Sequence, residues 1–240
     1  MARGGQATLE AGVVVLALDT DPDAPPARGL QVLTVRGSLP RGEVGGGERV
    51  AEAATRLAEA AGAELGARRG RNDRLRLVGL DDPPGRGART VTVWFYATSA
   101  ISQGGAGRWV SATRGARLDA RDAAALRRAV DLVRQDARQL GGAAALLGDV
   151  FTGDDLLRVH TVLHGGPEGS DRTFRRRIQE LRDAGVLRPV PEREVASLRA
   201  RVTRFRSPAG TGGRPPELFR YAGSGGSGEQ LVSLRARRSA

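Results

Sequence analysis

The chain has 240 residues, of which 40% are apolar and 27% charged. This balance is typical of a folded protein, and the length allows two modest domains with separate cores. The absence of cysteine excludes disulfides, thiolate metal sites and cysteine nucleophiles. No apolar run approaches the roughly 20 residues that span a bilayer, and the first residues lack the apolar region of a signal peptide. We therefore expect a cytoplasmic protein without a membrane partner.

The net charge of +11 is unevenly distributed along the chain. Residues 1–150 contain 21 arginines and 17 acids, a net +4, whereas residues 151–240 contain 17 arginines and 10 acids, a net +7. A basic module of this size favours a polyanion such as DNA, because phosphate neutralisation supplies most of the sequence-independent affinity. All 38 basic residues are arginine, which a GC-rich coding bias explains as well as selection does.

The first 115 or so residues combine predicted strands with one helix. Short β-branched and aromatic runs at 12–19, 30–36, 74–80 and 90–99 predict four strands. The stretch at 50–61 predicts a helix between the second and third of them. This order indicates a mixed α/β domain.

A long helix is predicted next, from a 4-3-4-3 spacing of apolar residues. The stripe consists of Leu126, Val130, Val133, Ala137 and Leu140. We expect it to connect domains or to pair protomers, and we expect Gly141 and Gly142 to end it.

Two further helices and a strand predict a winged helix-turn-helix. Thr152 and Asp155 have the spacing of a capping box at the start of the first helix. In the second helix, within 170–185, an apolar face faces away from a basic arc. The apolar residues are Phe174, Ile178 and Leu181, and the arc is formed by Arg172, Arg175, Arg176, Gln179 and Arg182. A Gly- and Pro-rich turn carrying Arg214, then a strand at 218–221, would form the wing. The alternative is that the arginines only form a solvated helix face.

His160 and His164 have the spacing of a zinc pair on a helix. No third ligand follows nearby in the sequence, so we expect them to pack within the helices instead.

Three motifs in this part of the chain resemble the Nudix-related transcriptional regulators. They are FTGDDLLRVHTVLHG, SDRTFRRRIQELRDAGVL and GRPPELFRY, and DDPPGRGARTVTVWFYA resembles a loop and strand of the family's Nudix domain. In the family's Asn-Phe-Arg-Arg-Lys core, Phe174, Arg175 and Arg176 match, whereas Thr173 replaces Asn and Arg177 replaces Lys. The resemblance implies a winged helix with DNA contacts from Arg172, Thr173, Arg175, Arg176, Arg177 and Arg214.

The resemblance also assigns the helix at 50–61 to a degenerate Nudix box. Gly42, Glu48 and Arg56 keep its spacing, but Leu57 occupies the acid position that follows Arg56. The paired acid positions fall on Ala60 and Ala61 or, with one residue deleted, on Glu59 and Ala60. Glu48, Glu52 and Glu59 are the residual acids, which is too few for an efficient magnesium site, so we expect no enzyme activity and no cofactor.

The family further implies ADP-ribose or a related nucleotide of NAD metabolism as a ligand, with Arg41, Arg86 and Arg89 as candidate phosphate contacts. The expected domains are a Nudix-like sensor at 1–142, a winged helix at 143–223 and a basic tail at 224–240. The expected function is that of a homodimeric regulator, a repressor by preference, on a palindromic operator. The alternative is an active ADP-ribose pyrophosphatase with an accessory second domain.

Overall fold

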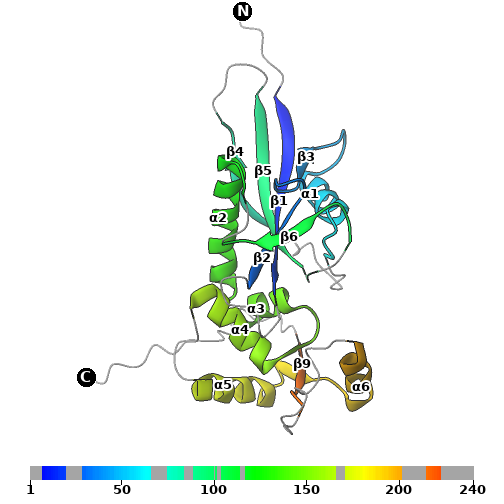
Figure 1. Cartoon of the computed structure of the whole chain (residues 1–240), viewed down its shortest axis with the longest axis vertical. Coiled ribbons are helices and arrows are strands. Elements are labelled where there is room, and N and C mark those ends of the chain that lie inside the picture. The colour runs from blue at the N-terminus through cyan, green and yellow to red at the C-terminus, as the bar shows by residue number, and fades with distance from the viewer. Residues whose placement is uncertain are drawn as a thin grey trace, which may run out of the picture. The chain divides into compact units, whose positions relative to one another are not determined.

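A computed structural model describes residues 7–19, 29–65, 75–83, 89–99, 101, 104–113, 117–165, 171–201 and 215–222 (Figure 1). The chain divides into two compact units. Unit 1 comprises residues 1–17 and 30–132, and unit 2 comprises residues 18–29 and 133–240. The predicted boundary at residue 142 therefore lies ten residues beyond this division. Among the described residues, no helix combines the length and the apolarity that crossing a membrane requires.

Unit 1 is built on a mixed six-stranded sheet (Figure 1). Its strands are β1 (Thr8–Leu18), β2 (Leu30–Thr34), β3 (Arg41–Glu43), β4 (Arg76–Asp81), β5 (Thr90–Thr98) and β6 (Arg108–Ser111). The order is β4-β5-β1-β2-β6, with β3 paired to β1. Strands β1 and β5 are parallel, whereas the β1–β3, β2–β6 and β4–β5 pairs are antiparallel. The four predicted strands are confirmed, and β3 and β6 were not predicted.

Helix α1 (Val50–Ala60) covers one face of this sheet. Its small buried residues Ala53, Ala54 and Ala58 pack in one core cluster with Ala11 and Val13 of β1. Residues 11–18 of β1 are all buried, as expected for a central strand covered on both faces. The helix that the sequence predicted at 50–61 is therefore confirmed.

Helix α2 (Ala120–Asp136) begins on the opposite face of the sheet. At its first turn, Arg121 donates hydrogen bonds to the Asp81 carboxylate of β4 and to the Thr92 hydroxyl of β5. The predicted apolar stripe is confirmed as a buried one from Leu126 to Ala137.

The predicted end of the long helix at Gly141 and Gly142 is wrong. The chain breaks earlier, at residues 137–139, and both glycines lie inside α3 (Leu140–Leu147). A Cβ atom on Gly142 would lie only 2.2 Å from the Asp136 carbonyl oxygen. Glycine is thus needed at position 142 because α3 packs directly against the end of α2, and not because a helix stops there.

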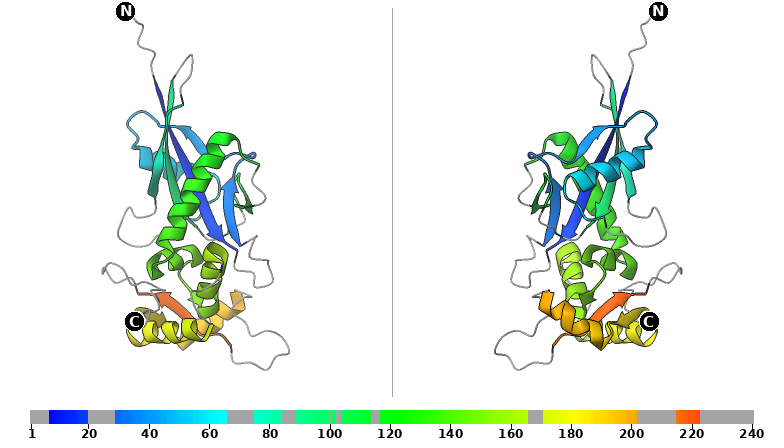
Figure 2. Two further views of the ribbon diagram at one scale, coloured as in Figure 1. Left: turned by 90° about the vertical axis from the view of Figure 1, so that its left-hand side faces the viewer. Right: turned by 90° about the vertical axis from the view of Figure 1, so that its right-hand side faces the viewer.

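Unit 2 consists of short helices and a small antiparallel sheet (Figure 2). After α3 come β7 (Phe151–Thr152), α4 (Gly153–His164), α5 (Asp171–Asp183), β8 (Leu187–Pro189), α6 (Glu192–Arg201) and β9 (Leu218–Tyr221). The strand order is β7-β9-β8. The two predicted helices and the strand at 218–221 are confirmed, whereas α6 lies in a charged stretch for which no element was predicted.

The capping box at the start of α4 is also confirmed. The Asp155 amide donates to the Thr152 hydroxyl at 3.0 Å, and the Thr152 amide donates to the Asp155 carboxylate at 2.8 Å. Both residues are buried, so the start of α4 is fixed against its neighbours.

Candidate nucleic-acid interface and ligand site

Helix α5 separates an apolar face from a basic one, as predicted. Phe174, Ile178 and Leu181 are buried. Arg172, Arg175 and Arg176 are exposed at the start of the helix, and the side chain of Arg176 is 82% exposed. Thr173 is half-buried beside them. The beginning of α5 therefore presents guanidinium groups to the surroundings while its other face anchors it in the core.

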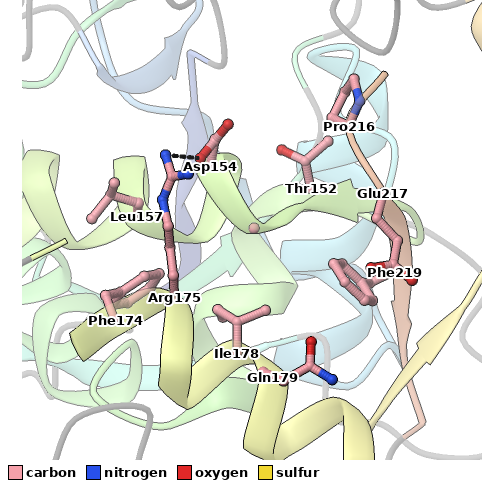
Figure 3. Close-up of a pocket in the computed structure, with 11 residues that line it drawn as sticks. Thr152, Asp154, Leu157, Phe174, Arg175, Ile178, Gln179, Pro216, Glu217 and Phe219 are labelled. Atoms are coloured by element: carbon pink, nitrogen blue, oxygen red, sulfur yellow. Dashed lines mark ion pairs between the residues drawn. The ribbon is translucent and has the colours of Figure 1, made fainter. Parts of the chain in front are cut away.

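Arg175 lies at the edge of a pocket of about 260 Å³ between the start of α4, helix α5 and strand β9 (Figure 3). Its guanidinium forms an ion pair with Asp154 at 3.7 Å, and both side chains are largely exposed. The floor of the pocket includes Phe174, Ile178 and Phe219. The ion pair is weak because solvent screens it, so it leaves Arg175 able to exchange Asp154 for a phosphate.

Arg176 and Arg177 share one carboxylate on the same helix. Arg176 Nε donates to Glu180 Oε1 at 3.1 Å, and Arg177 Nη1 donates to Glu180 Oε2 at 3.2 Å. The hydrogen bonds from Arg177 and Arg176 lower the pKa of Glu180, which is therefore ionised at neutral pH. Glu180 was not predicted from the sequence, although its spacing from Arg176 is that of a helical ion pair.

Arg182 connects α5 to the segment that precedes β9. Its Nη1 donates to Glu217 Oε2 at 3.1 Å. Of the predicted wing, Pro215 and β9 are described, whereas Arg214 lies outside the described residues. The assignment of Arg172, Thr173, Arg175, Arg176, Arg177 and Arg214 to DNA contacts stays a prediction.

The buried side chain of His160 packs against Phe174 of α5. Its ring is buried and lies edge-on to Phe174, with 5.5 Å between the ring centroids, and its Nε2 atom has no hydrogen-bond partner among the described residues. Burial, with a smaller contribution from His164, lowers the pKa of His160 to about 4. The geometry is that of a packed neutral ring. Across the described parts of the chain, no three His, Asp or Glu side chains gather closely enough to hold a metal ion.

In unit 1, two of the residues that keep the Nudix spacing, Glu48 and Arg56, form an ion pair with each other. Arg56 donates to Glu48 through Nε and Nη2, each at 2.9 Å, and the Gly45 amide donates to the same carboxylate at 3.0 Å. The hydrogen bond from Arg56 lowers the pKa of Glu48 to about 2. Glu48 therefore fixes the loop before α1.

The other acids of this helix do not complete a magnesium site. Glu52 accepts the Arg49 amide at 3.0 Å as a helix cap, and Glu59 is exposed further along α1. Leu57 is half-buried against the core cluster, and its Cδ2 atom lies close to Gly42. A hard cation needs several oxygen ligands that converge, so these residues do not fit a magnesium ion.

The predicted phosphate contacts Arg41 and Arg89 are both engaged by carboxylates. Arg41 Nη1 donates to the buried Asp122 at 3.1 Å, and its Nη2 lies 3.6 Å from Asp119. Arg89 makes a two-point ion pair with Asp82. Arg86 lies outside the described residues. A ligand phosphate at Arg41 or Arg89 would compete with these carboxylates for the guanidinium groups, and the role of both arginines in ligand binding stays a prediction.

Comparison with known proteins gives matches among solved structures only. No family model and no curated protein matches the chain. Shewanella oneidensis NrtR aligns with a TM-score of 0.61 and 20% identity, over 89% of this chain and 94% of that one. NrtR complexed with a 27mer DNA gives a TM-score of 0.61 and 19% identity, over 89% and 93%.

A third solved structure supports the same fold. A MutT/nudix family protein from Enterococcus faecalis aligns with a TM-score of 0.51 and 14% identity, over 92% of this chain and 88% of that one. At these identities the comparison is one of folds. The chain therefore has the fold of Shewanella oneidensis NrtR over most of its length, with a Nudix-like first unit.

Proposed function

We propose that this protein is a DNA-binding transcriptional regulator that uses α5 as its recognition helix. The observation that carries the proposal is the exposed row of Arg172, Arg175 and Arg176 at the start of a helix whose opposite face is anchored in a core. Recognition helices meet base edges with their first turns, where guanidinium groups bind guanine or phosphate.

The arrangement around α5 supports assigning unit 2 as a winged helix. Three helices, α3, α4 and α5, are followed by β8, α6 and β9, and β8 and β9 pair antiparallel. This order is that of a helix-turn-helix with a strand pair behind the recognition helix. The likeness to NrtR, which has been crystallised with a 27mer DNA, supports the same assignment.

We further propose that the protein acts as a homodimer on a palindromic operator. One winged helix contacts only a few base pairs, so useful selectivity requires two copies on half-sites about one or two helical turns apart. Repression is the simplest regulatory outcome for a dimer that occupies such an operator.

Unit 1 is proposed to sense a nucleotide, ADP-ribose or a related compound of NAD metabolism, without hydrolysing it. Leu57 and the alanines at the acid positions of α1 support binding over hydrolysis, because they leave too few ligands for magnesium. The competing hydrolase function would need a cluster of carboxylates that the described residues do not bring together.

Selection of bound duplexes from a random DNA pool by the full-length protein tests the regulator proposal. The expected result is an enriched sequence with twofold symmetry, bound by two copies of the chain. Recovery of no preferred sequence, together with binding that depends only on salt concentration, would reduce α5 to a solvated basic face.

A further inference from the structure

A second cavity lies in unit 1, where β2 ends and β6 begins. Its volume is about 570 Å³. Thr34 and Arg108 are directly opposite each other in the β2–β6 pair, so the turn after β2 and the start of β6 lie side by side. Leu118, before α2, closes another part of the wall. The volume is within the range of about 300–1,000 Å³ of small-molecule sites.

Three arginines from separate segments line this cavity. Arg36 lies in the turn after β2, Arg108 is the first residue of β6, and Arg117 lies in the segment that precedes α2. All three are exposed. Within the described residues, none of their guanidinium groups has a hydrogen bond or an ion pair, and none of the lining residues is acidic. Three positive charges therefore face one cavity, and no described residue supplies a neutralising carboxylate there.

These arginines differ from the other arginines of the unit that the sequence had singled out. Arg41, Arg56 and Arg89 are each held by a carboxylate. Like charges around one cavity repel, and an anion with several oxygen atoms relieves the repulsion while it accepts charged hydrogen bonds. The arrangement thus selects for a ligand with more than one negative charge.

The wall of the cavity is connected to the end of α1. The Gly107 amide donates to the Ala61 carbonyl at 2.9 Å, and a Cβ atom on Gly107 would lie 2.5 Å from that same oxygen. The buried Thr34 hydroxyl donates to the Arg108 carbonyl at 3.2 Å, which fixes the backbone from which Arg108 extends. Val110 and Leu118 supply an apolar part of the lining. The cavity is therefore a formed feature of the fold, with a charged side and an apolar side.

We propose that this cavity binds a small organic diphosphate or polyphosphate, with Arg36, Arg108 and Arg117 on the phosphate groups and the apolar lining beside the organic part. The proposal builds on the proposed sensing role of unit 1 and places the ligand in a cavity whose described lining residues include none of the acid positions of α1, although its wall is bonded to Ala61. A concave site of this size suits a nucleotide-sized molecule, whereas the phosphates of a duplex are spread along a convex surface.

Calorimetric titration of the full-length protein with inorganic pyrophosphate and with ADP tests this assignment. Arg108→Gln/Arg117→Gln is expected to weaken both by at least about tenfold, because each substitution removes a charged hydrogen-bond donor. The matched control is Arg127→Gln/Arg128→Gln, which removes the same number of charges at exposed positions of α2 that do not line the cavity, and it should leave both affinities within about twofold. If circular dichroism shows that the double variant does not fold, the single variant Arg117→Gln is titrated in its place.

Each other outcome overturns the assignment. Absence of measurable heat with both probes removes the site, and equal weakening by the control variant reduces it to general charge attraction. If pyrophosphate binding is unchanged but binding of a duplex DNA is weakened, the arginines belong to the DNA interface. Because the titration contains no DNA, its result is independent of whether α5 binds an operator.

Discussion

Arg176 Nε donates to Glu180 Oε1 at 3.1 Å, one helical turn further along α5, and Arg177 binds the other oxygen of the same carboxylate. In the free protein, one acid thus holds two of the arginines proposed to contact DNA. A carboxylate so close to the interface repels phosphate, and it keeps the arginines from binding any duplex without discrimination.

Glu180→Gln is therefore expected to raise the affinity for non-specific DNA several-fold and to steepen the salt dependence. The slope of log K against log salt should become more negative by about 1, since one more arginine reaches phosphate. Fluorescence anisotropy with a random-sequence duplex at several salt concentrations measures both. Glu192→Gln, an equal charge change on α6, is the control, and it should change neither the affinity for non-specific DNA nor its salt dependence. Equal effects of the two variants would mean that only net charge matters.

Gly62 and Gly37 provide a test of how unit 1 is packed. Both have a positive φ, +99° and +83°. A Cβ atom on Gly62 would lie 2.1 Å from the Gly104 carbonyl oxygen, whereas one on Gly37 would meet nothing within 4 Å. Gly37→Ala should lower the free energy of unfolding only by the left-handed backbone penalty, about 1–2 kcal/mol. Gly62→Ala should lower it by about 2 kcal/mol more, because the added Cβ also clashes.

Urea unfolding followed by tryptophan fluorescence measures this difference, because Trp94 and Trp109, the two tryptophans of the chain, both lie in unit 1. Equal destabilisation by the two substitutions would contradict the close approach between the end of α1 and the loop before β6.

His160 is expected to make unit 2 sensitive to acid. Burial lowers its pKa to about 4 from the ordinary value of 6.5, so the folded state keeps the ring neutral while the unfolded chain takes up a proton. The free energy of unfolding should then fall as the pH decreases from about 6.5 to about 4, by up to about 3 kcal/mol. Circular dichroism during urea unfolding at each pH measures it.

Two variants separate this contribution from that of the carboxylates. His160→Phe keeps a ring against Phe174 and should lose the histidine contribution, so its stability falls less between pH 6.5 and pH 4. His164→Gln, at the exposed neighbour on α4, should retain most of it. An identical pH dependence for His160→Phe and the natural chain would show that the buried ring does not control it.

Hydrolysis of ADP-ribose or of nucleoside diphosphates is expected to be no faster with magnesium than without it. The reason is that Leu57 and the neighbouring alanines replace the acids, and Glu48 is committed to Arg56. Chromatography measures the product released at a saturating substrate concentration. Magnesium-dependent turnover of about 1 per second or more, an ordinary enzyme rate, would support the hydrolase alternative instead.

Hydrophobic periodicity predicted the long strands, α1, α4 and α5, because each buries a continuous apolar face. It missed β3 and β6, whose short sequences RGE and RWVS carry too few residues for a period. It also misplaced the break after α2, since a glycine required by the contact between α3 and Asp136 looks like a glycine that ends a helix.

Of the candidate sites, one could be predicted from the sequence, and the others depend on contacts that only the folded chain makes. The basic face of α5 follows from residue spacing alone, because helical geometry places Arg172 and Arg176 on the side opposite Phe174. The ion pairs of Arg41 and Arg89 depend on partners that tertiary folding brings to them, and so does the cavity shared by Arg36, Arg108 and Arg117. In a chain with 38 arginines, composition does not distinguish a neutralised guanidinium from a free one.

The most direct test of the DNA-binding proposal is the affinity of Arg172→Ala/Arg176→Ala for the best duplex selected by the natural chain. Arg138→Ala/Arg193→Ala, an equal charge change at exposed positions of unit 2 outside α5, is the control. Removal of each guanidinium that binds a base should cost about 1–3 kcal/mol, so the α5 variant should bind the selected duplex at least about tenfold more weakly and discriminate less against changed half-sites. Unchanged affinity and selectivity of the α5 variant, or equal weakening by the control, would contradict the assignment of α5 as the recognition helix.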